Sequence, residues 1–365
     1  MTVLVAARVV TGDGGVTAAP AWVAVEHGRI AAIGTGAPPA GDGPAVDLGD
    51  ALLAPGFCDL QVNGTGTVDF ATATVAEVVD ALDALAAAGC TGCLPTLVSA
   101  PLDAYHAACA RLAAARDARP GLVLGVHLEG PFLGGAPGAH PVEHLRPADP
   151  AWLDALCDRH PGLVRLVTLA PEADPGLEAT RRLRARGVVV ALGHTRASYE
   201  EAVAAADAGA TMVTHVFNGM GPLHHRAPGV AGAALDDRRL VPTVVGDLVH
   251  VHPAVVRLVA TARPDAVVVS DAVAATGPPG ADAARLADGT LAGSLVTIDR
   301  CVRNLAAAGV AAGQAVRMAT GNAARALGAA DRGRVAPGCR ADLVALDPVT
   351  LAVRACWSGG APLAT

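Results

Sequence analysis

The chain has 365 residues, a formal net charge of −7 and a pI near 5.9, and 52% of its residues are hydrophobic. This acidic balance argues against nucleic-acid and membrane surfaces, which depend on clustered cations, and no uncharged apolar stretch approaches the roughly 18 residues that suggest a membrane span. All 27 basic residues are arginines, which excludes chemistry that needs a lysine amine, including a carboxylated lysine that bridges two metal ions.

Length and the N-terminal sequence bear on domain number and compartment. A chain of 365 residues suits a large barrel of about 250 residues with a smaller accessory domain. The first residues lack a basic segment followed by an apolar block and a small-residue cleavage site, so we expect a cytoplasmic protein.

Residues 1–52 alternate short apolar runs with glycine-rich turns, a pattern typical of β-hairpins. The predicted strands cover residues 2–10, 21–26, 29–33 and 45–53. The same pattern returns near the C-terminus, where the predicted strands cover residues 341–347 and 351–357. We therefore predict a small discontinuous β-sandwich or β-roll domain, built from residues 1–52 and 331–365, with a second domain inserted between its two parts.

Residues 53–330 alternate apolar strands with alanine-rich helical segments. The predicted helices cover residues 75–89, 102–118, 151–160, 176–186, 198–209, 253–262, 298–309 and 311–327. Strand-then-helix repetition of this length predicts a parallel α/β sheet, and a count near eight favours a (β/α)8 TIM barrel. A doubly wound open sheet is the alternative, and the flanking β-domain favours the closed barrel.

Four short polar signatures each follow a run that indicates a buried strand. The runs cover residues 122–126, 188–192, 211–213 and 266–269. The signatures supply Glu129, His194, His215 and Asp271 in that order. Because active sites of (β/α)8 enzymes form at the carboxyl ends of the strands, we expect these side chains to gather at one face. A carboxylate and two imidazoles give a divalent ion three protein ligands and leave coordination open for water and substrate.

Each of these residues also has a structural interpretation. A histidine after a strand is often a hydrogen-bonded structural residue, and Asp271 could cap a following helix. The small residues and the two prolines that follow Asp271 argue against a helix start there. A carboxylate beside an activated water can take its proton and later deliver it to a leaving amine, and we expect Asp271 to have this role.

Longer segments resemble the N-acetylglucosamine-6-phosphate deacetylases of the amidohydrolase superfamily. The matching segments are residues 55–60, 125–133, 193–195, 214–220, 246–250, 270–272, 291–294 and 320–324. They run in order through nearly the whole chain. The resemblance implies a (β/α)8 barrel, a small β-domain from both termini, a homodimer, and hydrolysis of the acetamide of a phosphorylated amino sugar.

The resemblance also implies roles for individual residues. It assigns the metal to Glu129, His194 and His215 and proton transfer to Asp271. The implied substrate contacts are Ala139, His140, Asn218, Gly219, Arg226, His250, Leu291, Ala292 and Gly293.

Arg226 and His250 are implied to engage the phosphate, and in the family this arginine can serve the neighbouring subunit. A guanidinium fork can clasp a phosphate through two hydrogen bonds. The alternative is an exposed loop arginine that pairs with Asp236 or Asp237.

The first predicted barrel strand departs from many amidohydrolases, which carry a His-x-His pair there for a second metal. Gln61 and Asn63 occupy these positions, and amides are weak ligands for zinc-like ions. We therefore expect one divalent ion per subunit, zinc first, with iron, manganese or cobalt as alternatives, and expect both amides to face the ligands or the substrate. The sequence assigns no role to His127, His224 or His225.

The predicted function is hydrolytic deacetylation of N-acetyl-D-glucosamine 6-phosphate, in amino-sugar catabolism, by a metal-activated water. The alternatives are the same chemistry on another N-acetylhexosamine 6-phosphate, such as the galactosamine epimer, or on a cyclic amide. A non-catalytic barrel is a further alternative, but it predicts missing ligands, and all four signature residues are present.

Overall fold

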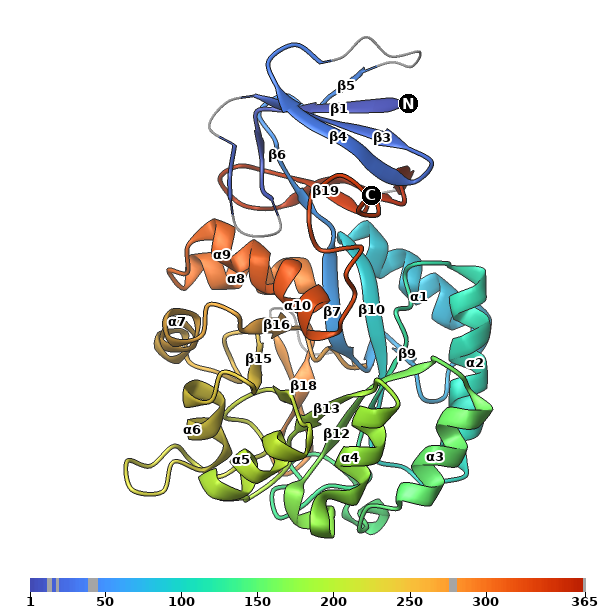
Figure 1. The fold of residues 1–365 in the computed structure, drawn as a ribbon, viewed down its shortest axis with the longest axis vertical. Coiled ribbons are helices and arrows are strands. Elements are labelled where there is room, and N and C mark those ends of the chain that lie inside the picture. Colours follow the sequence, from blue (N-terminus) through green and yellow to red (C-terminus); the bar gives the residue numbers. More distant parts are fainter. Residues whose placement is uncertain (12–14, 18–19, 39–44, 276–280, 364–365) are drawn as a thin grey trace.

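The computed structural model describes residues 1–11, 15–17, 20–38, 45–275 and 281–363 (Figure 1). An α/β barrel forms one end of the molecule, and a smaller group of strands, contributed by the N-terminal and C-terminal segments, forms the other. This confirms the predicted fold class. The predicted domain boundaries, residues 1–52 with 331–365 and residues 53–330, stay a proposal.

The barrel sheet has eight parallel strands that follow one another in chain order. They are β7 (Phe57–Val62), β10 (Cys90–Leu97), β11 (Val126–Glu129), β12 (Val164–Leu169), β13 (Val189–Leu192), β14 (Met212–Val213), β15 (Val241–Val245) and β16 (Val267–Val269). Every residue of β7, β10, β11, β14 and β16 is buried. Apolar strands without polar alternation suit this position, because helices cover the outer face and side chains fill the inside.

The first and last strands of the barrel, β7 and β16, meet just beyond their carboxyl ends. A β-bridge joins Val62 to Ala272. The Asp271 amide donates to the Gln61 carbonyl at 2.9 Å, and the Asn63 amide donates to the Ala272 carbonyl at 2.7 Å. The closure of the barrel therefore places three of the predicted site residues next to one another.

Helices surround the barrel (Figure 1). They are α1 (Val75–Ala87), α2 (Ala104–Ala118), α3 (Pro150–Arg159), α4 (Glu178–Ala185), α5 (Tyr199–Ala208), α6 (Gly229–Asp236), α7 (Pro253–Ala262), α8 (Ile298–Ala307), α9 (Ala312–Met318) and α10 (Gly321–Ala326). The prediction of one helix over residues 311–327 was wrong, because Thr320 has φ −131° and ψ −93° and separates α9 from α10. The sequence reading also missed α6, whose two glycines weaken the helical pattern.

Shorter elements extend the loops around the barrel. They are the strands β8 (Gly64–Thr65), β9 (Val68–Asp69), β17 (Ala283–Arg285) and β18 (Leu291–Ser294), and the 3-10 turns Val142–His144, Pro171–Ala173 and Pro175–Leu177. Within the described ranges, the longest helix is α2 with 15 residues, and no helix combines the length and apolar composition that a membrane crossing requires.

The small β-domain contains two sheets. One has the order β4 (Arg29–Thr35), β3 (Ala21–Glu26), β1 (Thr2–Ala6) and β5 (Ala45–Asp47), and the other has β2 (Arg8–Val9), β6 (Leu52–Pro55), β19 (Leu343–Leu346), β20 (Val353–Ser358) and β21 (Ala361–Leu363). Buried side chains from both sheets, including Leu4, Val23, Leu53 and Leu343, form one core. The single strands predicted over residues 2–10 and 45–53 are each divided, because the chain passes from one sheet to the other within them.

Glycines with positive φ follow several helices, including Gly89 after α1, Gly187 after α4 and Gly209 after α5. Gly209 closes α5 with φ +119°. A β-carbon added there would lie 2.7 Å from the Arg184 Cγ atom. Both the backbone conformation and the limited space therefore favour glycine at this position.

We expect Gly209→Ala to destabilise the protein by about 1–2 kcal/mol, the cost of a left-handed backbone for a residue with a β-carbon. Urea unfolding followed by circular dichroism measures the change. Gly221→Ala is the matched control, because no atom lies within 4 Å of the added β-carbon and its φ is not positive. Equal stability of the two variants would contradict the requirement for glycine at position 209.

Candidate active site

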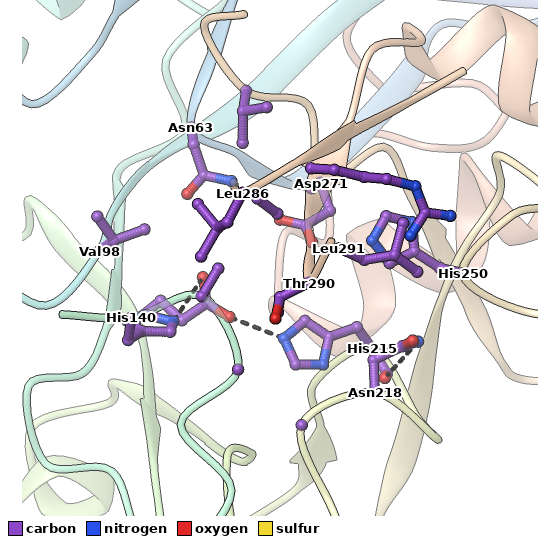
Figure 2. Close-up of a pocket in the computed structure, with 18 of the residues that line it drawn as sticks. Asn63, Val98, His140, His215, Asn218, His250, Asp271, Leu286, Thr290 and Leu291 are labelled. Atoms are coloured by element: carbon purple, nitrogen blue, oxygen red, sulfur yellow. Dashed lines mark hydrogen bonds and ion pairs between the residues drawn. The ribbon is translucent and has the colours of Figure 1, made fainter. Parts of the chain in front are cut away.

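A cavity of about 560 Å³ opens at the carboxyl ends of the barrel strands, among the loops that follow them (Figure 2). Its wall includes Glu129, His194, His215 and Asp271. The sequence prediction that these four side chains gather at one face therefore agrees with the geometry. In (β/α)8 enzymes this end of the barrel carries the active site.

Three buried donor atoms converge on one side of the cavity. Glu129 ends β11, and His194 and His215 lie two residues beyond β13 and β14. The Oε1 atom of Glu129 is 3.1 Å from His194 Nε2 and 2.9 Å from His215 Nε2. The two Nε2 atoms are 3.0 Å apart. In the described part of the chain, this is the group of His, Cys, Asp and Glu side chains placed to hold a metal ion.

The donor set fits a divalent ion. His194 Nδ1 lies 3.1 Å from the Ala136 carbonyl and donates to it, which leaves Nε2 with a free lone pair. Burial lowers the pKa of His194 to about 4, so the ring is neutral, as metal binding requires. Tetrahedral ligands of zinc lie roughly 3.3 Å from one another, close to the separations observed here.

Glu129 has further partners in addition to the two histidines. Gln61 Nε2 donates to Glu129 Oε1 at 2.9 Å, and His140 Nε2 lies 3.8 Å from Oε2. Burial alone would raise the pKa of Glu129, but the neighbouring side chains of His140, His194 and His215 hold that pKa well below its usual range. The carboxylate is therefore ionised, and the hydrogen bond from Gln61, on strand β7, fixes its orientation.

Asp271 stands apart from the three donors, at the closure of the barrel. Its Oδ1 atom accepts a hydrogen bond of 2.9 Å from Asn63 Nδ2. Burial first, and the charge of Glu129 second, raise the pKa of Asp271 to about 6. A carboxylate with such a pKa is suited to proton transfer near neutral pH. Figure 2 shows Asn63 and Asp271 on the wall opposite Asn218.

Three of the site residues have left-handed backbones. The φ angles are +50° for His194, +30° for His215 and +48° for Asp271. Such angles cost residues other than glycine roughly 1–3 kcal/mol each, and they concentrate at functional sites. Each one turns a side chain into the cavity directly after its strand.

Comparison with known proteins identifies the family to which the chain belongs. Residues 52–362 match the amidohydrolase family. The chain belongs to this family. It is 39% identical over 328 residues to N-acetylgalactosamine-6-phosphate deacetylase of Escherichia coli O157:H7, a match that covers 85% of this chain and 87% of the relative. It is 38% identical over 343 residues to human N-acetylglucosamine-6-phosphate deacetylase, covering 86% and 84% respectively.

Solved structures agree with this assignment. The fold is similar to that of a variant of N-acetyl-D-glucosamine-6-phosphate deacetylase from Mycobacterium smegmatis in complex with N-acetyl-D-glucosamine-6-phosphate. The TM-score is 0.92 at 37% identity, and the match covers 100% of this chain and 99% of the other. This amidohydrolase is therefore an enzyme of the metal-dependent, amide-hydrolysing type.

Most of the predicted substrate contacts of this amidohydrolase line the cavity. They are Ala139, His140, Asn218, Gly219, His250, Leu291, Ala292 and Gly293. Asn63 lines it as well, whereas Gln61 lies behind Glu129. The amide of Asn218 donates to the His215 carbonyl at 3.2 Å, so this side chain braces a ligand loop.

Arg226 lies outside this cavity. It is exposed on the loop between β14 and α6, and its Nη1 atom is 2.7 Å from His225 Nε2. The rings of His224 and His225 pack together with centroids 4.3 Å apart. Among the described residues, Arg226 forms its hydrogen bonds with His224 and His225, which do not line the cavity. Its role in substrate binding stays a prediction.

Sequence reasoning missed residues that hold the cavity histidines. His250 Nδ1 donates to the buried Asp247 carboxylate at 2.5 Å. The Ser99 amide donates to His140 Nδ1 at 3.3 Å, with Ser99 Oγ at 2.9 Å, so His140 Nε2 carries the ring hydrogen. The three-residue spacing of Asp247 and His250 was a usable signal, whereas Ser99 and His140 are brought together only by the fold.

His127 has a structural position inside the barrel. Its Nε2 atom is 2.7 Å from Thr168 Oγ1, and its Nδ1 atom is 3.2 Å from the Leu60 carbonyl. Burial lowers the pKa of His127 to about 4. The neutral ring therefore links β11 to β7 and β12, and it is not among the described residues that line the cavity.

We expect His194→Ala to lower the affinity for divalent metal by more than about 100-fold, because one of three protein ligands is lost. Elemental analysis of the purified variant after dialysis measures the metal content. His250→Ala is the control, since His250 lines the same cavity but is held by Asp247 outside the donor set. Full metal content in His194→Ala would remove the donor assignment.

Proposed function

We propose that this amidohydrolase hydrolyses the acetamide of N-acetyl-D-glucosamine 6-phosphate, giving glucosamine 6-phosphate and acetate in amino-sugar catabolism. One observation carries the proposal: three converging metal donors and a separate buried carboxylate share one cavity. Relatives that are 38% identical over most of their length are named for this deacetylation.

The proposed site holds one divalent ion on Glu129, His194 and His215. When bound, the ion supplies a Lewis acid for the acetyl carbonyl and lowers the pKa of a water molecule that attacks it. We propose zinc, and an oxygen-plus-imidazole donor set of this kind also accepts iron, manganese or cobalt. Gln61 and Asn63 are proposed to hold Glu129 and Asp271, since each donates to one of these carboxylates.

Asp271 is the proposed proton carrier. Its carboxylate accepts a proton as the water oxygen bonds to the carbonyl carbon, and it returns that proton to the nitrogen as the carbon–nitrogen bond breaks. Asn63 occupies Oδ1, which leaves Oδ2 for the proton. The new carboxylic acid gives the second proton of the water to the amine, so the products are the protonated amine and acetate, and atoms and charge balance.

His140 is proposed to contact the sugar, and His250 is proposed to engage the phosphate together with Arg226. Ser99 fixes the hydrogen of His140 on Nε2, the atom nearest Glu129 Oε2, where it can donate to a substrate oxygen. Asp247 fixes a hydrogen on Nδ1 of His250. The remaining contacts proposed for the sugar are Ala139, Asn218, Gly219, Leu291, Ala292 and Gly293.

The oligomer and compartment belong to the same proposal. We propose a cytoplasmic homodimer in which the exposed Arg226 reaches the cavity of the neighbouring subunit. Its support is the position of Arg226 on an exposed loop outside its own cavity.

A second candidate substrate is N-acetylgalactosamine 6-phosphate. The relative from Escherichia coli O157:H7 that is named for it is 39% identical to this chain. The two sugars differ only in the configuration of one hydroxyl group, so the same donors and Asp271 would serve both.

Asp271→Asn should keep the bound metal and lower kcat by about 10²–10⁴-fold, the range for loss of a positioned general base. Acetate release measures turnover, and elemental analysis measures metal. Asp83→Asn is the control, because Asp83 pairs with Arg119 on the surface. Retained turnover in Asp271→Asn would refute the proton-transfer role.

Acetate release from four sugars tests the substrate. We expect both phosphorylated N-acetylhexosamines, or one of them, to be turned over with a higher kcat/KM than their unphosphorylated counterparts, because a dianion adds charge-assisted contacts. Chains treated with a chelator should lose activity and regain it with added metal. Equal activity with and without the phosphate would contradict the proposed substrate class.

A further inference from the structure

Permanent positive charge at the cavity comes from one residue. The chain contains no lysine, and of the described residues that line the cavity, Arg285 is the arginine. The other basic residues there are histidines, and three of them, His140, His194 and His215, lie at the Glu129 end. A phosphate bound in this cavity therefore finds its fixed countercharge in this chain at Arg285.

Arg285 is held on a hairpin that lies across the cavity. It ends β17 and pairs with Leu291 at the start of β18. Its Nη1 atom donates to the Gly289 carbonyl at 2.8 Å. The nearby Asp288 carboxylate is engaged elsewhere, because its Oδ1 atom accepts from the Thr290 amide at 2.9 Å.

The guanidinium group retains unused donors. Within the described ranges, no carboxylate forms an ion pair with Arg285. An arginine offers five N–H groups in a planar fork, and one contact to a carbonyl leaves the others available. An exposed arginine without a partner is common on protein surfaces, but this one faces a cavity that also holds the proposed catalytic groups.

The hairpin also fixes how far Arg285 lies from the reacting end. The Ser294 amide donates to the Asp271 carbonyl at 2.8 Å, which ties the end of β18 to the proton carrier. Leu291 lies three residues earlier on the same strand, about 10 Å away for an extended chain. The backbone of Arg285, opposite Leu291, therefore lies about this far from the Asp271 carbonyl.

A hexosamine 6-phosphate has the matching arrangement of groups. The acetamide is on C2, and the carbon that bears the phosphate arm, C5, lies directly across the sugar ring. A substrate with its acetamide at Asp271 therefore directs its phosphate away from the metal donors. Figure 2 shows His250 and Leu291 on the flank of the cavity opposite His140.

We propose that Arg285 binds the substrate phosphate from within the same chain and selects phosphorylated over unphosphorylated N-acetylhexosamines. This inference rests on the proposed deacetylase function. It differs from the phosphate role proposed for Arg226, because it requires no second subunit. The guanidinium group donates to the phosphate oxygens through the N–H groups that Gly289 does not engage.

Steady-state kinetics on N-acetylglucosamine 6-phosphate and N-acetylglucosamine test this role. We expect Arg285→Gln to raise KM for the phosphorylated sugar by about 10–100-fold, the effect of losing a charged hydrogen bond. Its kcat/KM for the unphosphorylated sugar should stay unchanged. Arg285→Lys should restore part of the loss, because it returns the charge without the fork.

Arg334→Gln is the matched control. Arg334 is also an exposed arginine whose guanidinium donates to a backbone carbonyl four residues away, that of Ala330, but it does not line the cavity. Thermal unfolding and metal content of each variant verify that fold and metal site are intact.

The outcomes distinguish failure of the phosphate role of Arg285 from failure of the proposed deacetylase function. If the unaltered enzyme turns over the phosphorylated sugar and Arg285→Gln retains the same preference for it, Arg285 has no phosphate role. If Arg226→Gln alone removes the preference, the phosphate is bound across the dimer and the inference is overturned. If the unaltered enzyme shows no deacetylation of either sugar with metal present, the proposed function itself fails.

Discussion

The site depends on one buried negative charge. Glu129 Oε1 receives a hydrogen bond from β7 through Gln61 and faces the Nε2 atoms of His194 and His215. A buried carboxylate is costly unless opposite charge compensates it, and His194, with its lowered pKa, is neutral. Burial opposes protonation of His215, but its contact with Glu129 raises the pKa of His215, so this imidazole compensates part of the charge. A divalent cation among these donors would take over that compensation, which would make the metal part of the electrostatic balance of the barrel as well as of its chemistry.

Much of this arrangement could be predicted from the sequence. Uninterrupted Val- and Leu-rich runs indicate buried parallel strands, and the carboxyl ends of such strands meet at one face of a barrel. These two rules together predict that Glu129, His194, His215 and Asp271 lie at one face of the barrel. They work because strand direction and barrel closure alone determine where the first residues after each strand lie.

The parts that could not be predicted depend on contacts between distant loops. Ser99 holds His140 across 41 residues of sequence, and Arg285 reaches the cavity only because its hairpin is tied to Asp271 through Ser294. Helix α6 carries two glycines and little periodic signal, so tertiary packing determines its conformation. Local sequence patterns contain no information on such pairs.

The left-handed backbones of His194, His215 and Asp271 also affect how this chain can change over time. Glycine and asparagine adopt such angles at lower cost than histidine or aspartate. Selection for stability alone therefore favours replacing the residues that carry the chemistry. In a descendant without catalytic function, we expect these three side chains to be replaced early, while the barrel stays folded and gains stability.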